Sequence, residues 1–180
     1  MRPVVAYLFY SLDGVVTAPD RWVFDFDDEM AAHLGELVGG QDAVLLGRAT
    51  YEMWAPYWPT ATDEPFASFI NNVPKYVAST TLTEVTWNNS TLVKGSIADE
   101  IARLKQEPGR DIGVHGSPSL VRSLLRDGLL DELRLAVPPV VAGSGERLFD
   151  GSGEVRRLRL TRSQRTPTGA LLLGYSLRQA

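Results

Sequence analysis

AVLLGRATYE, residues 43–52, decides the fold, because an apolar run meets Gly-Arg-x-Thr where a helix is expected to begin. Residues 44–46 are typical of a strand buried on both faces, and Gly47 lets the backbone turn tightly and approach a ligand. Arg48 offers a charged fork suited to an anion, and Thr50 adds a hydroxyl at the helix start. The stretch indicates an anion site. The alternative is an ordinary turn, in which Arg48 forms a surface ion pair and Thr50 caps the helix.

The totals fit one globular domain that spans residues 1–180, with 44% hydrophobic and 22% charged residues. The chain has no cysteine, which excludes disulfides, thiolate zinc sites and a thiol nucleophile. Its net charge of -4 argues against a nucleic-acid or anionic-membrane surface. The apolar residues 4–10 run into Ser11 without a small-residue cleavage site, so we expect a strand rather than a signal, and a cytoplasmic protein.

The first half of the chain reads as strand, loop and helix. The apolar run 4–12 predicts a central strand, and residues 15–23 predict a long loop of the kind that often carries function. Trp22 in this loop could stack on a ligand or attach the loop to the core. Residues 25–38 have helical spacing, and His33 is expected on the solvated face.

Asp27 is the carboxylate of interest in this helix. The row Asp27, Ala31, Leu34 puts it at the edge of the apolar stripe, where it could face a semi-buried cleft. The alternative is that Asp27, with Asp25 and Asp28, favours the positive end of the helix dipole.

The next segment combines aromatic and hydroxyl side chains. Residues 53–59, which include Trp54, predict a short helix that breaks into an aromatic-walled turn, and residues 62–71 predict another helix. A strand over 75–79 ends in the hydroxyls of Ser79, Thr80 and Thr81. Such a cluster could hold a phosphate, although a satisfied turn or helix cap explains each hydroxyl as well.

The pattern of the opening stretch then recurs. A strand over 111–114 leads into His115-Gly116-Ser117-Pro118-Ser119 and a helix that continues to Gly128. Ser117 at the cap and Pro118 at the first helical position favour a sharp helix start, and Gly116 lets a ligand approach the N–H groups. An ordinary strand-to-helix turn is the alternative. Two such turns in one sheet favour a bound dinucleotide phosphate.

The C-terminal part predicts a strand over 130–137, a loop over 138–149 and a closing antiparallel hairpin around Pro167-Thr168-Gly169. Gly143-x-Gly145 in the loop lacks the third glycine of a dinucleotide fingerprint. The arginines of the hairpin fit a charged solvent face that discourages edge pairing.

Four motifs in order along the chain carry a resemblance to a known family. They are Ser11-Leu12-Asp13-Gly14, Gly47-Arg48-x-Thr50-Tyr51-Glu52, His115-Gly116-Ser117, and Pro139 with Gly143-Ser144-Gly145-x-Arg147-Leu148-Phe149. The chain resembles the dihydrofolate reductase-like superfamily, and most closely the reductase domain of the bifunctional riboflavin-biosynthesis deaminase-reductases. The resemblance implies an α/β, three-layer fold with a mostly parallel central sheet and a C-terminal antiparallel hairpin. His115 stands where the family has the first glycine of its Gly-Gly turn.

The same resemblance implies NADPH bound across the carboxyl ends of the strands, in agreement with the rule for open α/β sheets. Gly47, Arg48 and Thr50 correspond to the cofactor-phosphate turn, and residues 79–81 to the region of the adenosine 2′-phosphate. The remaining expected cofactor contacts are Gly116, Ser117, Ser119 and Leu120 at the pyrophosphate, and Phe9, Ser11, Val16 and Thr17 near the nicotinamide.

The resemblance implies an NADPH-dependent reductase that delivers hydride to a small polar carbonyl, imine or heterocycle of pteridine or pyrimidine type. Asp27 is the candidate proton donor or substrate anchor, and Asp13, Trp22 and Trp54 are candidate substrate contacts. No metal site is expected. The alternative function is nucleotide binding without turnover. The partner is a small-molecule substrate, and the resemblance alone implies a homodimer.

Overall fold

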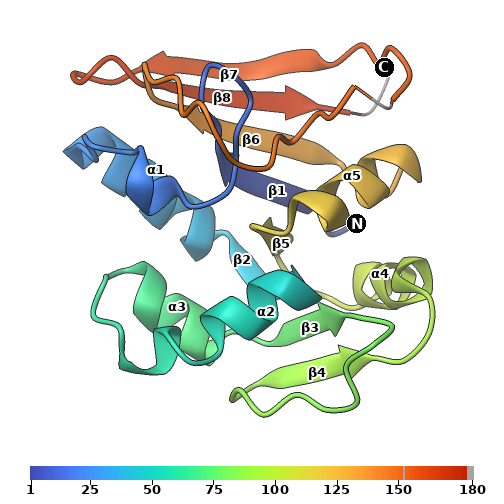
Figure 1. The fold of residues 1–180 in the computed structure, drawn as a ribbon. Coiled ribbons are helices and arrows are strands. Elements are labelled where there is room, and N and C mark those ends of the chain that lie inside the picture. Colours follow the sequence, from blue (N-terminus) through green and yellow to red (C-terminus); the bar gives the residue numbers. More distant parts are fainter. Residues whose placement is uncertain (152, 178–180) are drawn as a thin grey trace.

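The computed structural model describes residues 1–151 and 153–177, which form an eight-stranded sheet with helices on both faces (Figure 1). The strands are β1 (Val4–Phe9), β2 (Gln41–Gly47), β3 (Lys75–Ala78), β4 (Ser90–Val93), β5 (Asp111–His115), β6 (Glu132–Val137), β7 (Arg159–Arg165) and β8 (Leu171–Ser176). The α-helices are α1 (Asp28–Gly39), α2 (Arg48–Trp54), α3 (Phe66–Asn72), α4 (Ile97–Gln106) and α5 (Pro118–Arg126), and two short 3₁₀-helices are η1 (Pro19–Arg21) and η2 (Trp58–Thr60).

The strands lie in the order β4-β3-β2-β5-β1-β6-β8-β7. The six strands from β4 to β6 are parallel, and the β7–β8 hairpin continues the sheet antiparallel to β6. The predicted mostly parallel sheet with a C-terminal antiparallel hairpin is therefore confirmed. Among the described residues, no helix is long and apolar enough to span a membrane.

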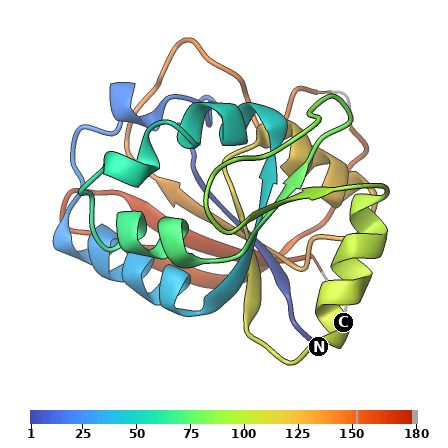
Figure 2. The same ribbon diagram turned by 90° about the horizontal axis from the view of Figure 1, so that it is seen from below.

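Alternate residues of the central strands face two different helical layers, as the period of two requires. On β2, Ala43 and Leu45 pack with the leucines of α4 and α5, whereas Val44 and Leu46 pack with α2 and α3. Tyr7 of β1 lies on the same face as α1. Figure 2 shows the helices on either side of the sheet. Burial on both faces explains why these strands are continuous apolar runs.

β1 is shorter than predicted, because regular pairing ends at Phe9 and the apolar run continues into a loop. The backbone of this loop still makes sheet-like hydrogen bonds: Tyr10 N–H donates to Ala136 O, and Leu12 N–H donates to Val140 O. Leu12 itself is exposed. The run 10–12 is thus held by the end of β6 and by the segment that follows it.

His33 differs from its predicted place on the solvated face. Its ring is buried, 2% exposed, and lies 5.9 Å edge-on from the ring of Tyr7. The C-terminal hairpin causes the difference, because Arg162 and Gln164 of β7 bond to Glu36 and Glu29 and so bring β7 against α1. A face that looks solvated on an isolated helix is covered by a distant strand.

Candidate functional site

The loops that carry the predicted cofactor residues follow four neighbouring strands, β3, β2, β5 and β1. These strands are parallel and nearly level at their carboxyl ends, since Gly47 pairs with Ala78, and His115 pairs with Tyr7. The segments beginning at Ser79, Arg48, Gly116 and Tyr10 therefore leave the sheet at one edge. Open α/β sheets bind their ligands at this edge.

The two glycine turns touch through a pair of hydroxyl groups. Ser117 donates from its Oγ to Thr50 Oγ1 at 2.7 Å and accepts from Gly47 N–H at 2.8 Å. A Cβ on Gly47 would lie 2.8 Å from Ser117 Oγ, and one on Gly116 would lie 3.2 Å from the Thr50 side chain. Both positions therefore need glycine for the turns to meet. Gly116 also has a φ of +58°, which favours glycine.

Ser117 has an unusual place at the start of α5. It is the N-cap residue with φ +54°, yet its side chain bonds to the neighbouring turn rather than to its own helix. The free N–H groups at the start of α5 are thus not blocked by the cap side chain. Leu120 is buried against the sheet, and Ser119 is exposed at the edge.

The charged and hydroxyl groups around these turns lie at the surface. Arg48 is exposed and forms an ion pair with Glu52 at 2.9 Å, which is the surface pairing that the sequence left open. Ser79 Oγ accepts from the N–H groups of Thr81 and Leu82, so it stabilises the turn after β3. Thr80 and Thr81 are exposed. These groups can reach a ligand, but Arg48 and Ser79 also have structural partners.

The loop after β1 is held down by Trp22. The indole is 5% exposed, and its Nε1–H donates to Thr17 O at 2.9 Å. Its place in the core corrects the prediction that it contacts a substrate, because a buried ring has no free face for stacking. Val16 is buried, whereas Phe9 and Thr17 are half-buried at the edge.

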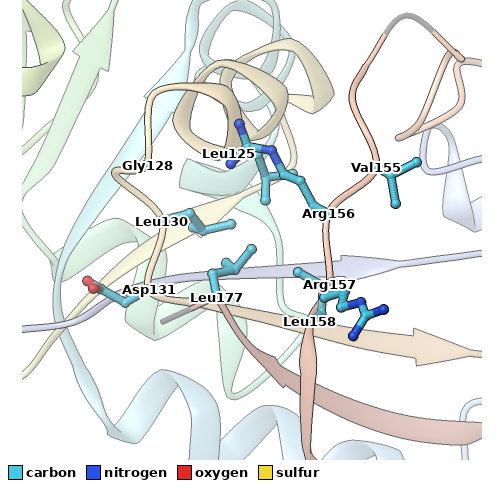
Figure 3. Close-up of a pocket in the computed structure, with 9 residues that line it drawn as sticks. All are labelled: Leu125, Gly128, Leu130, Asp131, Val155, Arg156, Arg157, Leu158 and Leu177. Atoms are coloured by element: carbon cyan, nitrogen blue, oxygen red, sulfur yellow. The ribbon is translucent and has the colours of Figure 1, made fainter. Parts of the chain in front are cut away.

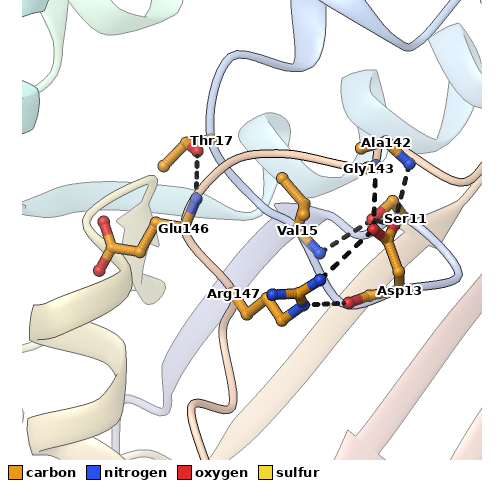
Figure 4. A network of polar contacts seen from close by, with 8 residues as sticks. All are labelled: Ser11, Asp13, Val15, Thr17, Ala142, Gly143, Glu146 and Arg147. Atoms are coloured by element: carbon orange, nitrogen blue, oxygen red, sulfur yellow. Dashed lines mark hydrogen bonds and ion pairs between the residues drawn. The ribbon is translucent and has the colours of Figure 1, made fainter.

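The carboxylate of Asp13 is hydrogen-bonded within the protein. Its carboxylate accepts from Ser11 Oγ at 2.7 Å, Ala142 N–H at 2.9 Å and Gly143 N–H at 3.0 Å (Figure 4). The Ser11 hydrogen bond, followed by the bond from Ala142, lowers the pKa of this carboxyl to about 2. With its oxygens already occupied, Asp13 is better suited to joining two loops than to binding a substrate.

Asp27 caps α1. One carboxylate oxygen accepts from Met30 N–H at 2.9 Å, and the other accepts from Thr168 Oγ1 at 2.7 Å in the β7–β8 turn. Hydrogen bonds from Thr166 and Thr168 hold the pKa of this carboxyl well below its usual range. The proton-donor prediction does not fit this geometry, because an ionised carboxylate has no proton to give. The alternative at the helix start accounts for Asp27.

Trp54 belongs to an aromatic cluster on the α2–α3 side of the sheet. Its ring lies edge-on to Trp58 at 5.8 Å and to Phe66 at 5.6 Å. Phe66 also lies edge-on to His115 at 5.3 Å. Trp54 is half-buried, so part of the ring remains open to a ligand.

His115, which precedes the Gly116 turn, is a buried residue with one defined partner. Its Nε2 lies 2.7 Å from Gln41 Oε1, and burial lowers its pKa to about 4. The ring is therefore neutral at physiological pH. The Gln41 side chain occupies the space above Gly113, where a Cβ would lie 2.1 Å from Oε1.

A cavity of about 510 Å³ lies away from all these residues (Figure 3). It is lined by the segment before β6, the end of α5 and residues 155–158, so it lies at the amino end of β6. Asp131 in its wall is bonded to Lys105 Nζ at 2.6 Å and to Val4 N–H. The cavity is therefore not part of the predicted site, which lies at the carboxyl ends of the strands.

Comparisons with known proteins agree with this arrangement. The family model of the RibD C-terminal domain matches residues 2–172. The chain belongs to the RibD C-terminal domain family. It is 28% identical to the uncharacterized protein YyaP of Bacillus subtilis (strain 168) over 182 residues, which covers 97% of this chain and 94% of that protein. The resemblance predicted from the four motifs is confirmed.

Solved structures show that the family fold covers nearly the whole chain. A protein from Shewanella sp. PV-4 with a provisional riboflavin-biosynthesis name matches with a TM-score of 0.77 at 22% identity, over 98% of this chain and 99% of that one. A pyrimidine reductase-like protein from Corynebacterium diphtheriae matches with a TM-score of 0.69 at 15% identity, over 99% and 93%. The fold of this RibD C-terminal domain protein is thus dihydrofolate reductase-like.

Sequence reasoning missed the contacts that join separate motifs of this RibD C-terminal domain protein. The bond between Ser117 and Thr50 spans 67 positions, and those from the 142–143 amides to Asp13 span about 130. The only signal was that Asp13-Gly14 and Gly143-x-Gly145 both belonged to the set of family motifs. Motif order does not say which motifs touch.

Proposed function

We propose that this protein is an NADPH-dependent reductase. It transfers a hydride to a small polar carbonyl, imine or heterocyclic substrate of pteridine or pyrimidine type. The proposal is supported above all by the contact between the Gly47 and Gly116 turns through Ser117 and Thr50. This contact joins into one surface the two turns that the sequence linked to a bound dinucleotide phosphate.

The order of the strands suggests how the dinucleotide lies. With its pyrophosphate at the start of α5, beside the β2 turn, one half extends toward the hydroxyls after β3 and the other toward the loop after β1. The residues fit such a ligand: glycines allow close approach, Arg48 and Ser119 are exposed, and residues 79–81 offer hydroxyls. The adenosine 2′-phosphate then lies by β3 and the nicotinamide by Phe9, Val16 and Thr17.

Reduced nicotinamide supplies the hydride, and the residues of this chain bind and orient it. Phe9, at the end of β1, and Trp54, at the end of α2, are partly open aromatic side chains, and a flat substrate can lie against such rings. Because Asp27 is ionised and bonded, the proton that completes the reduction comes from water, which is left as hydroxide.

The family supports the reaction class. A pyrimidine reductase-like protein has the same fold at a TM-score of 0.69, and the family model takes its name from the C-terminal domain of RibD. We extend the words "pyrimidine reductase-like" to this chain as part of the proposal. The substrate of this protein and its preference for NADPH over NADH are open to the same assays.

Arg48 provides the direct test of the cofactor site. Arg48→Ala should weaken NADPH binding by about 1–3 kcal/mol, the usual value of a hydrogen bond from a charged group. Glu52→Ala is the matched control, because it removes the same ion pair but keeps the guanidinium. Titration calorimetry measures both. Equal losses in the two variants, or none in Arg48→Ala, would contradict a cofactor contact at Arg48.

Turnover separates a reductase from a nucleotide-binding protein. Oxidation of NADPH, followed at its absorbance band, is expected with at least one member of a panel of pteridines, aminopyrimidines, imines and small carbonyls. Tight NADPH binding without oxidation across the panel would favour the non-catalytic alternative. We also propose a homodimer, for which light scattering coupled to size exclusion should give twice the chain mass.

A further inference from the structure

His115 connects the interior of the protein to one of the two glycine turns. It is the last residue of β5, and Gly116 and Ser117 follow it with φ values of +58° and +54°. A serine in the left-handed region persists only where its surroundings hold it. His115 pairs with Tyr7 of β1, but the regular pairing of β5 with β2 ends one residue earlier, at Val114. The position of the turn relative to β2 therefore depends on side chains.

A β-bulge in β2 brings Gln41 to His115. The register between β2 and β5 shifts between Gln41 and Ala43, and this shift puts the Gln41 side chain on the face of the sheet that α3 covers. There it lies over Gly113, where a Cβ would be 2.1 Å from Oε1, and its Oε1 lies 2.7 Å from His115 Nε2. Because an amide oxygen can only accept, Nε2 carries the proton of the neutral ring, and a second proton would go to Nδ1.

This contact is kept at a cost in stability. Gln41 Nε2 is buried and has no hydrogen-bond partner among the described residues. A buried amide group without a partner is destabilising, and an apolar side chain at position 41 would avoid the cost. The bulge, the missing side chain at Gly113 and the glutamine all support one hydrogen bond, which holds the ring of His115 in place.

The rings packed around His115 are uncharged. Phe66 and Phe69 of α3 lie edge-on to it at 5.3 Å and 5.9 Å, and Tyr7 is its neighbour on β1. Burial raises the pKa of Tyr7, so its hydroxyl is neutral as well. Burial by itself lowers the pKa of His115 to about 4. The surroundings therefore fit the neutral ring and disfavour an imidazolium.

The other titratable groups on this face of the sheet have places of their own. Asp111 lies at the opposite end of β5, and Lys75 donates from Nζ to the carbonyls of Ile70 and Val73 at the end of α3. His33 lies beyond Tyr7, on α1. Within the part of the chain that the structure describes, no carboxylate forms an ion pair with the ring of His115.

We propose that His115 is a positioning residue for the pyrophosphate turn: its neutral ring, bonded to Gln41, holds Gly116 and Ser117 in the form that binds the cofactor. A second proton on the ring breaks this fit and releases the turn. The inference rests on the proposed function, which puts the pyrophosphate at this turn. It extends that function, because cofactor affinity then depends on the protonation of one buried ring.

The first test compares two ligands at pH 7 and pH 5. NADP⁺ carries the pyrophosphate and is stable in mild acid, whereas adenosine 2′-phosphate lacks the pyrophosphate. Both carry the 2′-phosphate, so its own titration affects them alike. On going to pH 5, the dissociation constant of NADP⁺ for wild type should rise about tenfold more than that of adenosine 2′-phosphate, because the proton favours the released turn. Titration calorimetry measures both constants.

Variants of the ring separate protonation from packing. His115→Gln keeps a donor for Gln41 Oε1 but takes up no proton, so it should bind NADP⁺ nearly as wild type does at pH 7 and lose the extra weakening at pH 5. His115→Phe also lacks the donor, and it should bind NADP⁺ about tenfold more weakly at both pH values.

His33→Gln is the matched control. His33 is the other of the two histidines in the chain and is also buried, but its ring packs against Tyr7 and not against the turn. This variant should show the same extra weakening of NADP⁺ at pH 5 as wild type. Circular dichroism at each pH confirms that every protein compared is folded.

The second test uses wild type alone. A ligand that binds only when the ring is neutral must lower the pKa of that ring, by the reciprocity of linked equilibria. Saturating NADP⁺ should therefore move the titration of the His115 Cε1–H resonance to lower pH, whereas adenosine 2′-phosphate should leave it in place. The spectrum of His33→Gln assigns the two histidine resonances.

Each outcome supports or contradicts the proposal. If wild type and His115→Gln lose the same affinity for NADP⁺ between pH 7 and pH 5, or if adenosine 2′-phosphate weakens as much as NADP⁺, His115 does not position the turn while the reductase proposal stands. If neither variant at position 115 folds, the two ligands and the resonance of wild type decide. If wild type binds neither NADP⁺ nor NADPH at pH 7, the proposed function fails and the inference fails with it.

Discussion

Ser117 illustrates how much one hydroxyl can do at the level of the residue. A serine before Pro118 is an ordinary helix cap in sequence, but its Oγ bonds Gly47 N–H and Thr50 Oγ1 instead. The bonds fix the distance between the β2 and β5 turns, and they leave the start of α5 open. The same side chain type at the same position therefore has a different role from the one that local pattern predicts.

Gly113 gives a residue-scale prediction about stability. Gly113→Ala should lower the free energy of unfolding by about 2–4 kcal/mol, because a Cβ displaces Gln41 and breaks its buried hydrogen bond to His115. Gly35→Ala in α1 is the control, since nothing lies within 4 Å of its Cβ. It should raise stability by about 0.5–1 kcal/mol. Urea unfolding measures both, and a neutral Gly113→Ala would show that Gln41 has room to move.

His115 gives a prediction about pH. Its pKa is about 4 in the folded chain, below the value of 6.5 for an ordinary histidine, because burial disfavours the charged ring. As the pH falls below about 6.5, the unfolded chain takes up a proton that the folded chain refuses. The contribution of His115 to the free energy of unfolding is therefore fully present above about pH 6.5, and it is lost progressively as the pH falls toward 4.

Urea unfolding between pH 7 and pH 5 tests this. His115 should account for a loss of about 2 kcal/mol over that interval. In His115→Gln the free energy of unfolding should change less with pH, even if it is lower at every pH. His33→Gln is the comparison, since burial also lowers the pKa of His33. An unchanged slope in His115→Gln would mean that the buried ring accepts a proton without cost.

At the level of the element, α1 and the C-terminal hairpin form one unit. Asp27 caps α1 and also bonds Thr168, while Arg162 and Gln164 of β7 bond Glu36 and Glu29. These contacts explain both the burial of His33 and the ionised state of Asp27. A helix that reads as amphipathic with one solvated face is held on a second side by the last two strands.

Asp27→Ala tests this joint role. It should lower the melting temperature by several degrees, because α1 loses its cap and the β7–β8 turn loses its anchor. NADPH affinity should stay close to wild type. Asp25→Ala, a change at an exposed neighbouring residue, should alter neither quantity. If Asp27→Ala instead melted at the wild-type temperature but lost turnover, Asp27 would take part in the reaction.

At the level of the whole molecule, the order of the strands in the sheet determines which loops an extended ligand can contact. The loops after β3, β2, β5 and β1 leave one edge in that order, while the 510 Å³ cavity lies at the amino end of β6. A dinucleotide is long enough to touch several loops, and the parallel strands bring four of them together. The proposed function therefore uses only the carboxyl ends of the strands.

Hydrogen exchange with and without NADPH tests this arrangement. Saturating NADPH should slow exchange in the segments 79–82, 47–50, 116–120 and 15–17. Residues 128–131, which line the cavity at the other end, should exchange at the same rate in both states. Protection confined to the cavity side would contradict the binding edge proposed for this protein.

The sequence by itself determined most of the strands, the starts of α2 and α5, and the two glycine turns. These depend mostly on local rules: apolar runs for strands buried on both faces, glycine at the positive φ of Gly116, and proline at the first turn of α5. The order of four motifs was also enough to identify the family, which the match over residues 2–172 bears out. The strands and the helix starts are set by residues close together in the chain, whereas the family motifs are spread along its length.

Only the tertiary structure decided what these residues touch. Thr50 meets Ser117, Asp13 holds the 142–143 amides, and Asp27 bonds Thr168, all across tens of residues or more. A polar side chain takes whichever partner the packed strands bring within reach, and that partner is not encoded nearby. AVLLGRATYE fixed a strand, a turn and a helix, but the hydroxyl that completes its turn comes from Ser117 at the start of α5.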